Sequence, residues 1–321
     1  MNVEEIRICG TVQGVGFRPT VYRLAKACGL CGDVRNDGQG VLIRVSGKQE
    51  SIDEFVHKLQ KECPPLAKIN VLTRKRYQGE FQFDDFVISG SVSDRVKTEI
   101  APDAATCPQC KAETLDPFSR WYRYPFTNCT HCGPRLSIIR AIPYDRSNTS
   151  MDAFAMCSDC FGEYKDVNNR RFHAQPAACH VCGPNAWLER SDGKPITSSM
   201  FSMLDDIDSV CTLLQKGEIV AIKGLGGFHL ACDATNETAV QKLRQRKGRQ
   251  SKPFALMARD MAVIEEYCTP TIVEKELLES PTAPIVLLEA KAGGDEGERG
   301  SGRITKMENW AAKKKLTLQA A

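Results

Sequence analysis

The stretch GTVQGVGFRP, residues 10–19, decides the fold of the first part of the chain. Before it, Ile6 and Ile8 alternate with polar residues, which is typical of a strand with one buried face. Behind Pro19, a residue suited to the first turn of a helix, apolar residues recur at helical spacing. The glycines therefore join a strand to a helix, and the question is whether this turn also binds a ligand.

The same kind of alternation extends over residues 4–90. We expect a second strand at residues 31–36, a turn at NDGQG and a third strand at residues 41–45. A second amphipathic helix is expected over residues 52–63, and a last strand over residues 81–88. The order βαββαβ predicts a ferredoxin-like sandwich, an antiparallel sheet with two helices on one face.

The glycine turn has the features of an anion-binding loop. Glycine allows backbone angles that let peptide N–H groups converge, and such a nest at the start of a helix binds oxyanions. Arg18 is placed to add a bidentate, charge-assisted contact to the same anion. The motifs of nucleotide P-loops and of dinucleotide folds are both absent, and the loop alone is also compatible with a structural turn. The candidate loop comprises Gln13, Gly14, Val15, Gly16, Phe17 and Arg18.

A second stretch, GDVRNDGQG at residues 32–40, favours the ligand-binding interpretation. Asn36 could hold a water molecule by its amide, although alone it is also compatible with a residue that enters a turn. An acyl phosphate has a good leaving group, so positioning and charge stabilisation can replace a strong base. With GxVQGVGFR and GxVRNxxxG, residues 4–90 resemble the acylphosphatase family. The resemblance implies that family's fold and a catalytic pair, here Arg18 and Asn36.

A tandem repeat of cysteines occupies residues 107–190. Each copy has the pattern Cys-x2-Cys-x18-Cys-x2-Cys-Gly-Pro, and the second copy follows the first at an offset of 50 residues. Two CxxC pairs can close a tetrahedral Zn2+ site, and four thiolates leave no open position, so both sites should be structural. The equal gaps favour ligation within each copy, with a cross-braced arrangement as the alternative. The predicted ligands are Cys107, Cys110, Cys129, Cys132, Cys157, Cys160, Cys179 and Cys182.

Composition limits the class of protein. The 321 residues suffice for two or three domains, and a net charge of +3 gives no reason to expect bulk DNA as a partner. The sequence has no apolar run near the ~20 residues of a membrane span and no signal peptide, so we expect a cytoplasmic protein. In a reducing compartment, 15 cysteines favour metal ligation over disulfides. Those outside the repeat, Cys211 and Cys268 among them, are expected to be small core residues.

Residues 200–290 return to α/β character. We expect a helix that ends at Gly217, followed by buried strands in IVAIKGLGGFHLACDA, PFALM and PIVLL. KGLGGFHLACDA and KGRQSKPFALM resemble the first half of a YrdC-like nucleotide-binding domain. The resemblance implies that Lys247 and Arg249 contact ATP phosphates, and we add Lys223 as a candidate. On charge alone, the basic cluster is also compatible with a solvated helix end.

One family joins these three parts in this order, the carbamoyltransferases of NiFe-hydrogenase maturation. The resemblance implies that carbamoyl phosphate is hydrolysed at the acylphosphatase site and that the carbamate is adenylated with ATP in the YrdC-like domain. The carbamoyl group then passes to the C-terminal cysteine of a partner maturation protein, which makes a cyanide ligand from it. The expected parts are an acylphosphatase-like domain (1–92), a linker (93–106), the tandem zinc-finger region (107–190), a partial YrdC-like domain (200–290) and a disordered tail (291–321).

The chain departs from that family after residue 288. The second YrdC half and the transfer domain have no counterpart, so we expect a truncated or frame-shifted product, or a fragment, that performs only the acylphosphatase step. Two alternatives remain. One is an acylphosphatase-type hydrolase whose zinc-dependent module docks a partner, and the other is a zinc-ribbon RNA-binding protein, against which the modest net charge argues.

Overall fold

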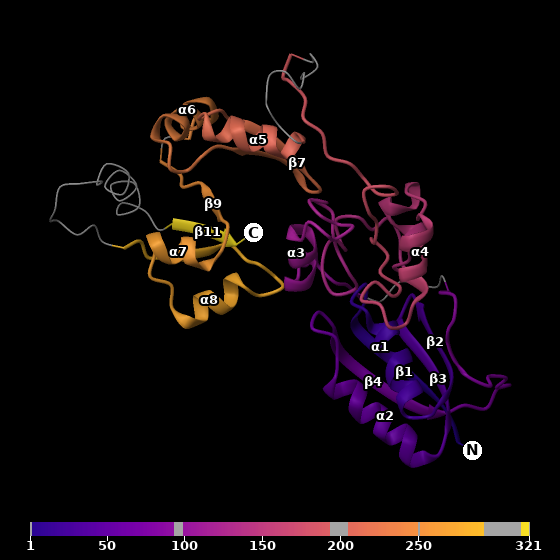
Figure 1. Cartoon of the computed structure of the whole chain (residues 1–321). Coiled ribbons are helices and arrows are strands. Elements are labelled where there is room, and N and C mark those ends of the chain that lie inside the picture. The colour runs from indigo at the N-terminus through magenta and orange to yellow at the C-terminus, as the bar shows by residue number, and fades with distance from the viewer. Residues whose placement is uncertain (1, 93–98, 193–204, 250, 292–315, 321) are drawn as a thin grey trace. The chain divides into compact units, whose positions relative to one another are not determined.

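The computed structural model describes residues 2–92, 99–192, 205–249, 251–291 and 316–320. The chain forms two compact units, Met1–Asn185 and Ala186–Ala321 (Figure 1). The first unit contains the sheet with the glycine loop and the whole cysteine repeat. The candidate phosphate site and both cysteine clusters therefore belong to one body.

The first domain is the predicted ferredoxin-like sandwich. Its strands run in the order β4-β1-β3-β2 with antiparallel pairing, and β5 and β6 add parallel pairs to β2 and β1. The elements are β1 (Asn2–Gln13), α1 (Phe17–Ala27), β2 (Cys31–Asp37), β3 (Gly40–Gly47), α2 (Gln49–Lys61), β4 (Lys68–Arg76), β5 (Phe86–Ile88) and β6 (Glu99–Ile100).

The last strand of the βαββαβ order lies earlier than predicted. It is β4, whose residues are mostly exposed and whose polar sequence, KINVLTRKR, hides the alternation; only Ile69 and Leu72 pack on the core. Of the predicted strand at residues 81–88, only β5 forms, because Phe81 and Phe83 pack against each other outside the sheet with ring centroids 5.2 Å apart. The short strand β6 lies within the segment predicted to be a linker.

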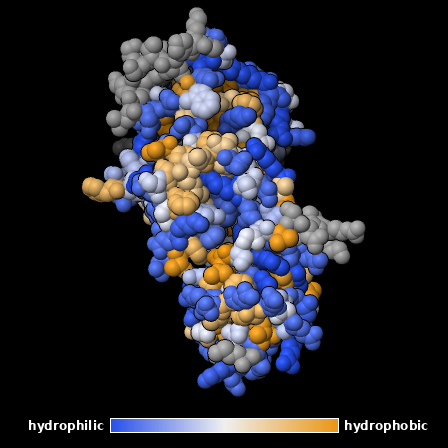
Figure 2. Space-filling view, turned by 90° about the vertical axis from the view of Figure 1, so that its right-hand side faces the viewer, coloured by the Kyte–Doolittle hydropathy of each residue, from blue (hydrophilic) through white to orange (hydrophobic). Residues whose placement is uncertain are grey.

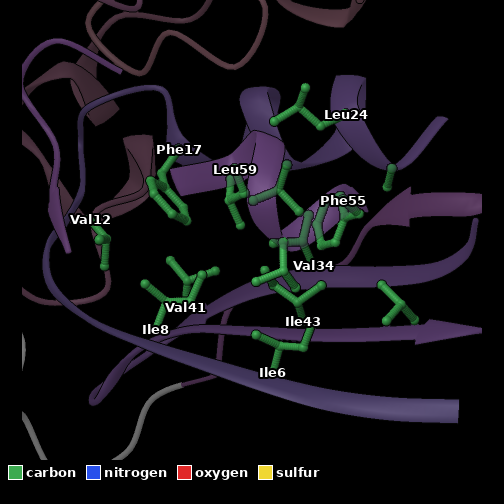
Figure 3. Close-up of a cluster of buried hydrophobic side chains, with 14 of the residues drawn as sticks. Ile6, Ile8, Val12, Phe17, Leu24, Val34, Val41, Ile43, Phe55 and Leu59 are labelled. Carbon is green, nitrogen blue, oxygen red and sulfur yellow. The ribbon is translucent and has the colours of Figure 1, made fainter. Parts of the chain in front are cut away.

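The hydrophobic core of this domain lies between the sheet and its two helices (Figure 3). Ile6 and Ile8 of β1 are fully buried, as their alternation predicts, and they face Phe55 and Leu59 of α2 across the layer. Burial of each such side chain contributes about 2 kcal/mol. Because Phe17 belongs to the same core, the end of the glycine loop is fixed to the most tightly packed part of the domain.

The cysteine repeat has little regular structure and repeats itself in space as in sequence. Each copy begins with a helix directly after its first cysteine, α3 (Pro108–Leu115) and α4 (Ser158–Lys165). Arg123 and His173, at matching positions, both take left-handed backbone angles, with φ of 60° and 54°. Two 3-10 turns, η1 (Arg146–Asn148) and η2 (Ser150–Ala153), lie between the copies.

The second unit is shorter and contains two separate sheets. A hairpin of β7 and β8 stands apart from a three-stranded sheet with the order β10-β11-β9. Gly217 follows the first helix with φ 79°, as predicted for a helix-terminating glycine. The elements are α5 (Asp206–Gln215), β7 (Val220–Gly224), β8 (Gly227–Ala231), α6 (Glu237–Lys247), β9 (Ala255–Ala258), α7 (Met261–Tyr267), α8 (Ile272–Leu278), β10 (Val286–Leu288) and β11 (Leu316–Ala320).

Three predictions about this unit were wrong. The strands β7 and β8 are not buried as predicted, since the side chains of Ile222, Phe228 and Leu230 are exposed. Figure 2 shows one face of the molecule, on which hydrophobic residues lie at the surface among hydrophilic ones. Cys211 is exposed rather than in the core, whereas Cys268 is buried as expected. Of the tail predicted to be disordered, residues 292–315 lie outside the described residues, but β11 pairs with β9 and β10 because LTLQA alternates as a strand does.

Every helix among the described residues is too short or too polar to cross a membrane.

Candidate functional site

The glycine loop connects β1 to α1 in the conformation that only glycine adopts easily. Gly14 and Gly16 have φ of 74° and 78°, and Gly16 precedes the first residue of α1. Val15 and Phe17 are buried in the core and hold the loop from below. The first N–H groups of a helix have no partner within the helix and lie at the positive end of its dipole. The loop therefore offers N–H donors to an anion.

Arg18, the predicted phosphate ligand, projects from the first turn of α1 and is only 9% exposed. Its Nη2 donates to the Asp145 carboxylate at 2.7 Å and to the Tyr144 carbonyl at 3.5 Å, and its Nη1 donates to the Ser91 hydroxyl at 3.2 Å. Asp145 lies between the two copies of the cysteine repeat. The repeat thus supplies the counter-charge of the candidate catalytic arginine.

Asn36 lies in β2 opposite Val41 of β3 and is 2% exposed. Its side-chain oxygen is buried and accepts no hydrogen bond from any described residue. A buried amide oxygen without a partner costs about 1–3 kcal/mol unless a water molecule or a ligand satisfies it. Its position on the cavity with Arg18 therefore suits a residue that holds a water molecule.

Gln13 was predicted to belong to the phosphate-binding loop, but its side chain forms hydrogen bonds within the protein. Its side-chain nitrogen donates to the carbonyls of Asp37 and Gly40 at 2.7 and 2.9 Å, and its oxygen accepts from the Tyr144 N–H at 3.1 Å. Every polar group of this buried amide is thus committed within the protein. Gln13 joins the loop, the turn after β2 and the cysteine repeat, and it leaves anion contact to the backbone and Arg18.

The cysteine repeat closes over the loop and leaves a cavity of about 20 Å3, enough for one or two water molecules. Methyl groups added to Gly16 and Gly14 would lie 2.5 Å from Thr130 and 3.2 Å from Arg135, so the repeat packs directly on the loop. The sequence analysis missed this half of the site, because nothing in the cysteine pattern shows which surface it covers. From the first domain the lining includes Gly14, Gly16, Phe17, Arg18 and Asn36, and from the repeat Thr130, Arg135, Tyr144, His173 and Gln175.

Arg135 connects the first cysteine cluster to the loop. It follows Cys132-Gly133-Pro134, is 1% exposed, and its Nε donates to the Gly14 carbonyl by a short hydrogen bond. Its remaining N–H groups donate to backbone carbonyls around the cluster, so every N–H group of this buried guanidinium has an acceptor. The acceptors are the carbonyls of Cys129 (3.2 Å), Thr130 (2.9 Å), Cys132 (2.9 Å) and Pro134 (2.8 Å).

Two aromatic groups in the lining stay uncharged at neutral pH. Burial, together with the positive charges of Arg18 and Lys165, lowers the pKa of His173 to about 4. Burial raises the pKa of Tyr144 to about 12. Among the titratable groups that line the cavity, charge is therefore carried by the arginines.

The eight cysteines form two clusters, each within one copy of the repeat, as the equal spacing favours. The four sulfurs of each cluster lie within 4.8 Å of one another, and four of the pairs, Cys129–Cys132 and Cys179–Cys182 among them, are 3.8 Å apart. A tetrahedral ion with bonds of about 2.3 Å to sulfur needs an edge of about 3.8 Å. The geometry and the all-thiolate donor set therefore fit a metal ion of this kind.

Each cluster receives an arginine from the other copy. Arg120 of the first copy donates to the Cys160 sulfur at 3.3 Å, and Arg170 of the second donates to the Cys110 sulfur at 3.5 Å. Each guanidinium also pairs at 2.8 Å with a glutamate of the opposite copy, Glu163 or Glu113. The shared register of Arg120 and Arg170 in the sequence thus reflects a reciprocal contact between the copies.

The candidate nucleotide ligands lie at exposed positions on and beside two elements of the second unit, β7 and α6. Lys223 lies in β7 with its ammonium 5.5 Å from the Phe228 ring centroid. Lys247 is the last residue of α6, and Arg249 follows the left-handed Gly248; both are exposed. Cations at a helix C-terminus stabilise the helix dipole, so this position also has a structural explanation.

Family profiles match all three parts of the chain. The Acylphosphatase profile matches residues 4–88, and the HypF finger profile matches residues 106–139 and 156–189. The Telomere recombination profile, that of the Sua5, YciO and YrdC proteins, matches residues 212–300.

Similar proteins contain the same parts. Carbamoyltransferase HypF of Rhodobacter capsulatus is 48% identical over 293 residues, which are 91% of this chain and 38% of that relative. An acylphosphatase of Caldivirga maquilingensis is 43% identical over 81 residues, 84% of its length. A crystal structure of full-length HypF in the phosphate- and nucleotide-bound form superimposes with a TM-score of 0.86 at 40% identity, over 99% of this chain and 40% of that one.

The chain spans about two fifths of the length of the HypF proteins it matches, with all three of its parts within the shared length. Its first domain covers most of the single-domain acylphosphatases, at 38–43% identity. The first domain therefore belongs to the acylphosphatase family, and the chain, over the length it shares with them, belongs to the HypF carbamoyltransferases.

Proposed function

We propose that this chain hydrolyses acyl phosphates, carbamoyl phosphate in particular, in the cavity of Arg18 and Asn36. The observation that carries the proposal is the convergence of three groups on one small cavity. They are the glycine loop with its N–H donors, the Arg18 guanidinium and the unpartnered buried oxygen of Asn36. Phosphoryl oxygens require such donors, and the attacking water requires such an acceptor.

The reaction needs no strong base in this arrangement. The loop N–H groups and Arg18 hold the phosphoryl group and neutralise its charge, while the Asn36 amide orients a water molecule toward it. The water oxygen bonds to phosphorus while the bond between phosphorus and the acyl oxygen breaks. The leaving group departs as a carboxylate or, from carbamoyl phosphate, as carbamate, and the proton of the water ends on the phosphate that is formed. His173 is a poor base at neutral pH because of its low pKa, which is consistent with catalysis by positioning.

The metal of both clusters is proposed to be zinc in a structural role. Four thiolates leave no coordination position for a substrate, and the sulfur spacing suits a tetrahedral ion. Zinc there would fix the Cys129–Cys132 turn and, through Arg135, the carbonyl side of the glycine loop.

The later steps of the HypF pathway are proposals for the complete protein. They are adenylation of the carbamate with ATP, with Lys223, Lys247 and Arg249 as candidate ligands, and transfer to the C-terminal cysteine of a partner maturation protein. The support is the match to the Telomere recombination profile and the nucleotide-bound form named for a HypF structure. For the present chain we propose the acylphosphatase step alone.

Phosphate release from carbamoyl phosphate, with and without ATP, tests this proposal. Arg18→Ala and Asn36→Ala should each lower kcat/KM at least 100-fold, because each removes a group that acts in the transition state. Arg23→Ala is the matched control, since Arg23 lies on the same helix with an exposed side chain and should retain wild-type activity. Unchanged phosphate release by Arg18→Ala would refute the assigned site.

A further inference from the structure

We propose that His173 is a specificity-determining residue that hydrogen-bonds the carbamoyl group of the substrate and so favours carbamoyl phosphate over acyl phosphates without an amide. The inference rests on the proposed function and assigns a task to a residue of the cysteine repeat at the acylphosphatase site. Three observations carry it: where the imidazole lies, how it is held, and which hydrogen bonds it has left.

His173 belongs to the lining of the cavity that contains Arg18 and Asn36. The cavity is small, about 20 Å3, and the repeat packs directly on the loop, so the acyl group of a substrate whose phosphoryl group is held by the loop would lie against residues of the repeat. Within the roof that the repeat supplies, His173, Ala174, Gln175 and Pro176 come from the second copy, beside Thr130, Arg135 and Tyr144. An acyl group bound in this cavity therefore faces side chains of the repeat, His173 among them, which could distinguish one acyl group from another.

The imidazole is held in place by packing. Its ring centroid lies 4.6 Å from that of Phe172 and 4.9 Å from that of Tyr164, and its backbone N–H donates to the Tyr164 carbonyl at 3.0 Å. The left-handed backbone conformation is common to both copies of the repeat, because Arg123 adopts it at the matching position of the first copy. What differs is the side chain, and only the second copy contributes this turn position to the cavity lining.

The polar groups around His173 are already committed. The Gln175 amide oxygen accepts from the Arg146 N–H at 2.8 Å, and its nitrogen donates to the Tyr164 hydroxyl and the His173 carbonyl at 3.1 and 2.9 Å. The His173 ring nitrogens, in contrast, form no hydrogen bond with any residue that the structure describes. Among the roof side chains, the imidazole therefore has the hydrogen-bonding capacity left for a ligand.

A neutral imidazole has one N–H donor and one acceptor nitrogen. Burial, and with it the charge of Arg18, lowers the pKa of His173 and keeps the imidazole in this form. A carbamoyl group has a carbonyl oxygen that can accept from the imidazole N–H and an amide N–H that can donate to the other ring nitrogen. An acetyl group has no N–H, and a site built to hydrogen-bond a group discriminates strongly against an analogue that lacks it.

The test compares kcat/KM for carbamoyl phosphate and acetyl phosphate in the full chain. His173→Phe keeps an aromatic ring for the stacking but removes both nitrogens, whereas His173→Asn restores a donor and an acceptor and tolerates the left-handed backbone. We expect wild type to prefer carbamoyl phosphate, His173→Phe to reduce that preference at least tenfold, and His173→Asn to recover part of it. Arg123→Phe, at the same turn position of the first copy, should keep the wild-type preference.

Metal content and circular dichroism show whether each variant is folded. A wild-type preference near one, or a preference in His173→Phe equal to that of wild type, would overturn the inference while leaving the hydrolase intact. Failure of wild type on both substrates would instead overturn the proposed function and, with it, this inference.

Discussion

Arg18 and Asp145 form an ion pair of 2.7 Å between residues 127 positions apart in the chain. One belongs to the first turn of α1, and the other to the segment between the two cysteine clusters. The carboxylate engages a guanidinium nitrogen of the same group that is proposed to bind phosphate. A dianionic phosphoryl group at the loop would therefore meet a nearby negative charge as well as a positive one.

Asp145→Asn should strengthen phosphate binding. The asparagine keeps an oxygen that can accept from Arg18, but it removes the charge that opposes the anion. For a partly exposed pair we expect about a tenfold lower inhibition constant for inorganic phosphate, or about 1.4 kcal/mol. The measurement is competitive inhibition of acyl phosphate hydrolysis by phosphate. Weaker inhibition in the variant would mean that Asp145 chiefly orients Arg18.

Arg135→Met should destabilise the first unit and weaken the anion site together. The substitution leaves buried carbonyls of the cysteine cluster and of Gly14 without donors. We expect a loss of about 2–4 kcal/mol in the free energy of unfolding and a lower affinity for phosphate. Denaturant titration and phosphate inhibition measure the two effects. A variant with unchanged phosphate affinity would show that the loop holds its shape without Arg135.

Replacing Cys129 and Cys132 by serine should lower the bound metal from two ions per chain to one. These residues supply two of the four sulfurs of the first cluster, and the second cluster has its own complete set. Elemental analysis of the purified chain gives the count. Cys211→Ser is the control, because Cys211 is exposed and lies outside both clusters, and it should retain both ions.

The crossed arginines predict that metal affinity is affected in the other copy. Arg120→Met should weaken the cluster of Cys160, and Arg170→Met that of Cys110, by about 10- to 100-fold, because each removes a hydrogen bond to a ligand sulfur. Chelator competition measures this effect in chains that retain a single cluster. If Arg120→Met lowered the metal affinity of the first cluster only, the contact between Arg120 and Cys160 would not contribute to metal binding.

The sequence predicts features within one element or repeat better than it predicts contacts between segments that are far apart in the chain. The alternation of Ile6 and Ile8, the glycine loop and the equal cysteine spacing lead to the sandwich, the candidate pair and the grouping of the clusters. They do so because each depends on neighbours within one element or one repeat. The edge strand β4 was missed because most of its residues are exposed and its largely polar sequence hides the alternation.

The roof of the cavity could not be predicted for a different reason. Contacts such as Gln13 to Tyr144 and Arg135 to Gly14 join segments more than 120 positions apart, and no periodicity in either segment indicates the other. Buried strands were wrongly expected in β7 and β8. An apolar sequence indicates that a strand can be buried, but it does not show that another element covers the strand. Half of the candidate site was thus visible only in three dimensions.

His173 should make the stability of the first unit depend on pH. Its pKa is about 4 in the folded protein and about 6.5 in an unfolded chain, so between these values the unfolded state binds more protons. The free energy of unfolding should therefore fall as the pH is lowered from 7.5, and by pH 5.5 this group alone accounts for about 1 kcal/mol. His173→Asn removes the titrating group but leaves the cysteines unchanged, so loss of metal at low pH affects both proteins equally. Denaturant titrations at pH 7.5 and 5.5 give the free energy of unfolding of both proteins. Between these pH values, the variant should lose about 1 kcal/mol less than the wild type. An equal loss in both proteins would mean that the imidazole is more hydrated than its packing between Phe172 and Tyr164 implies.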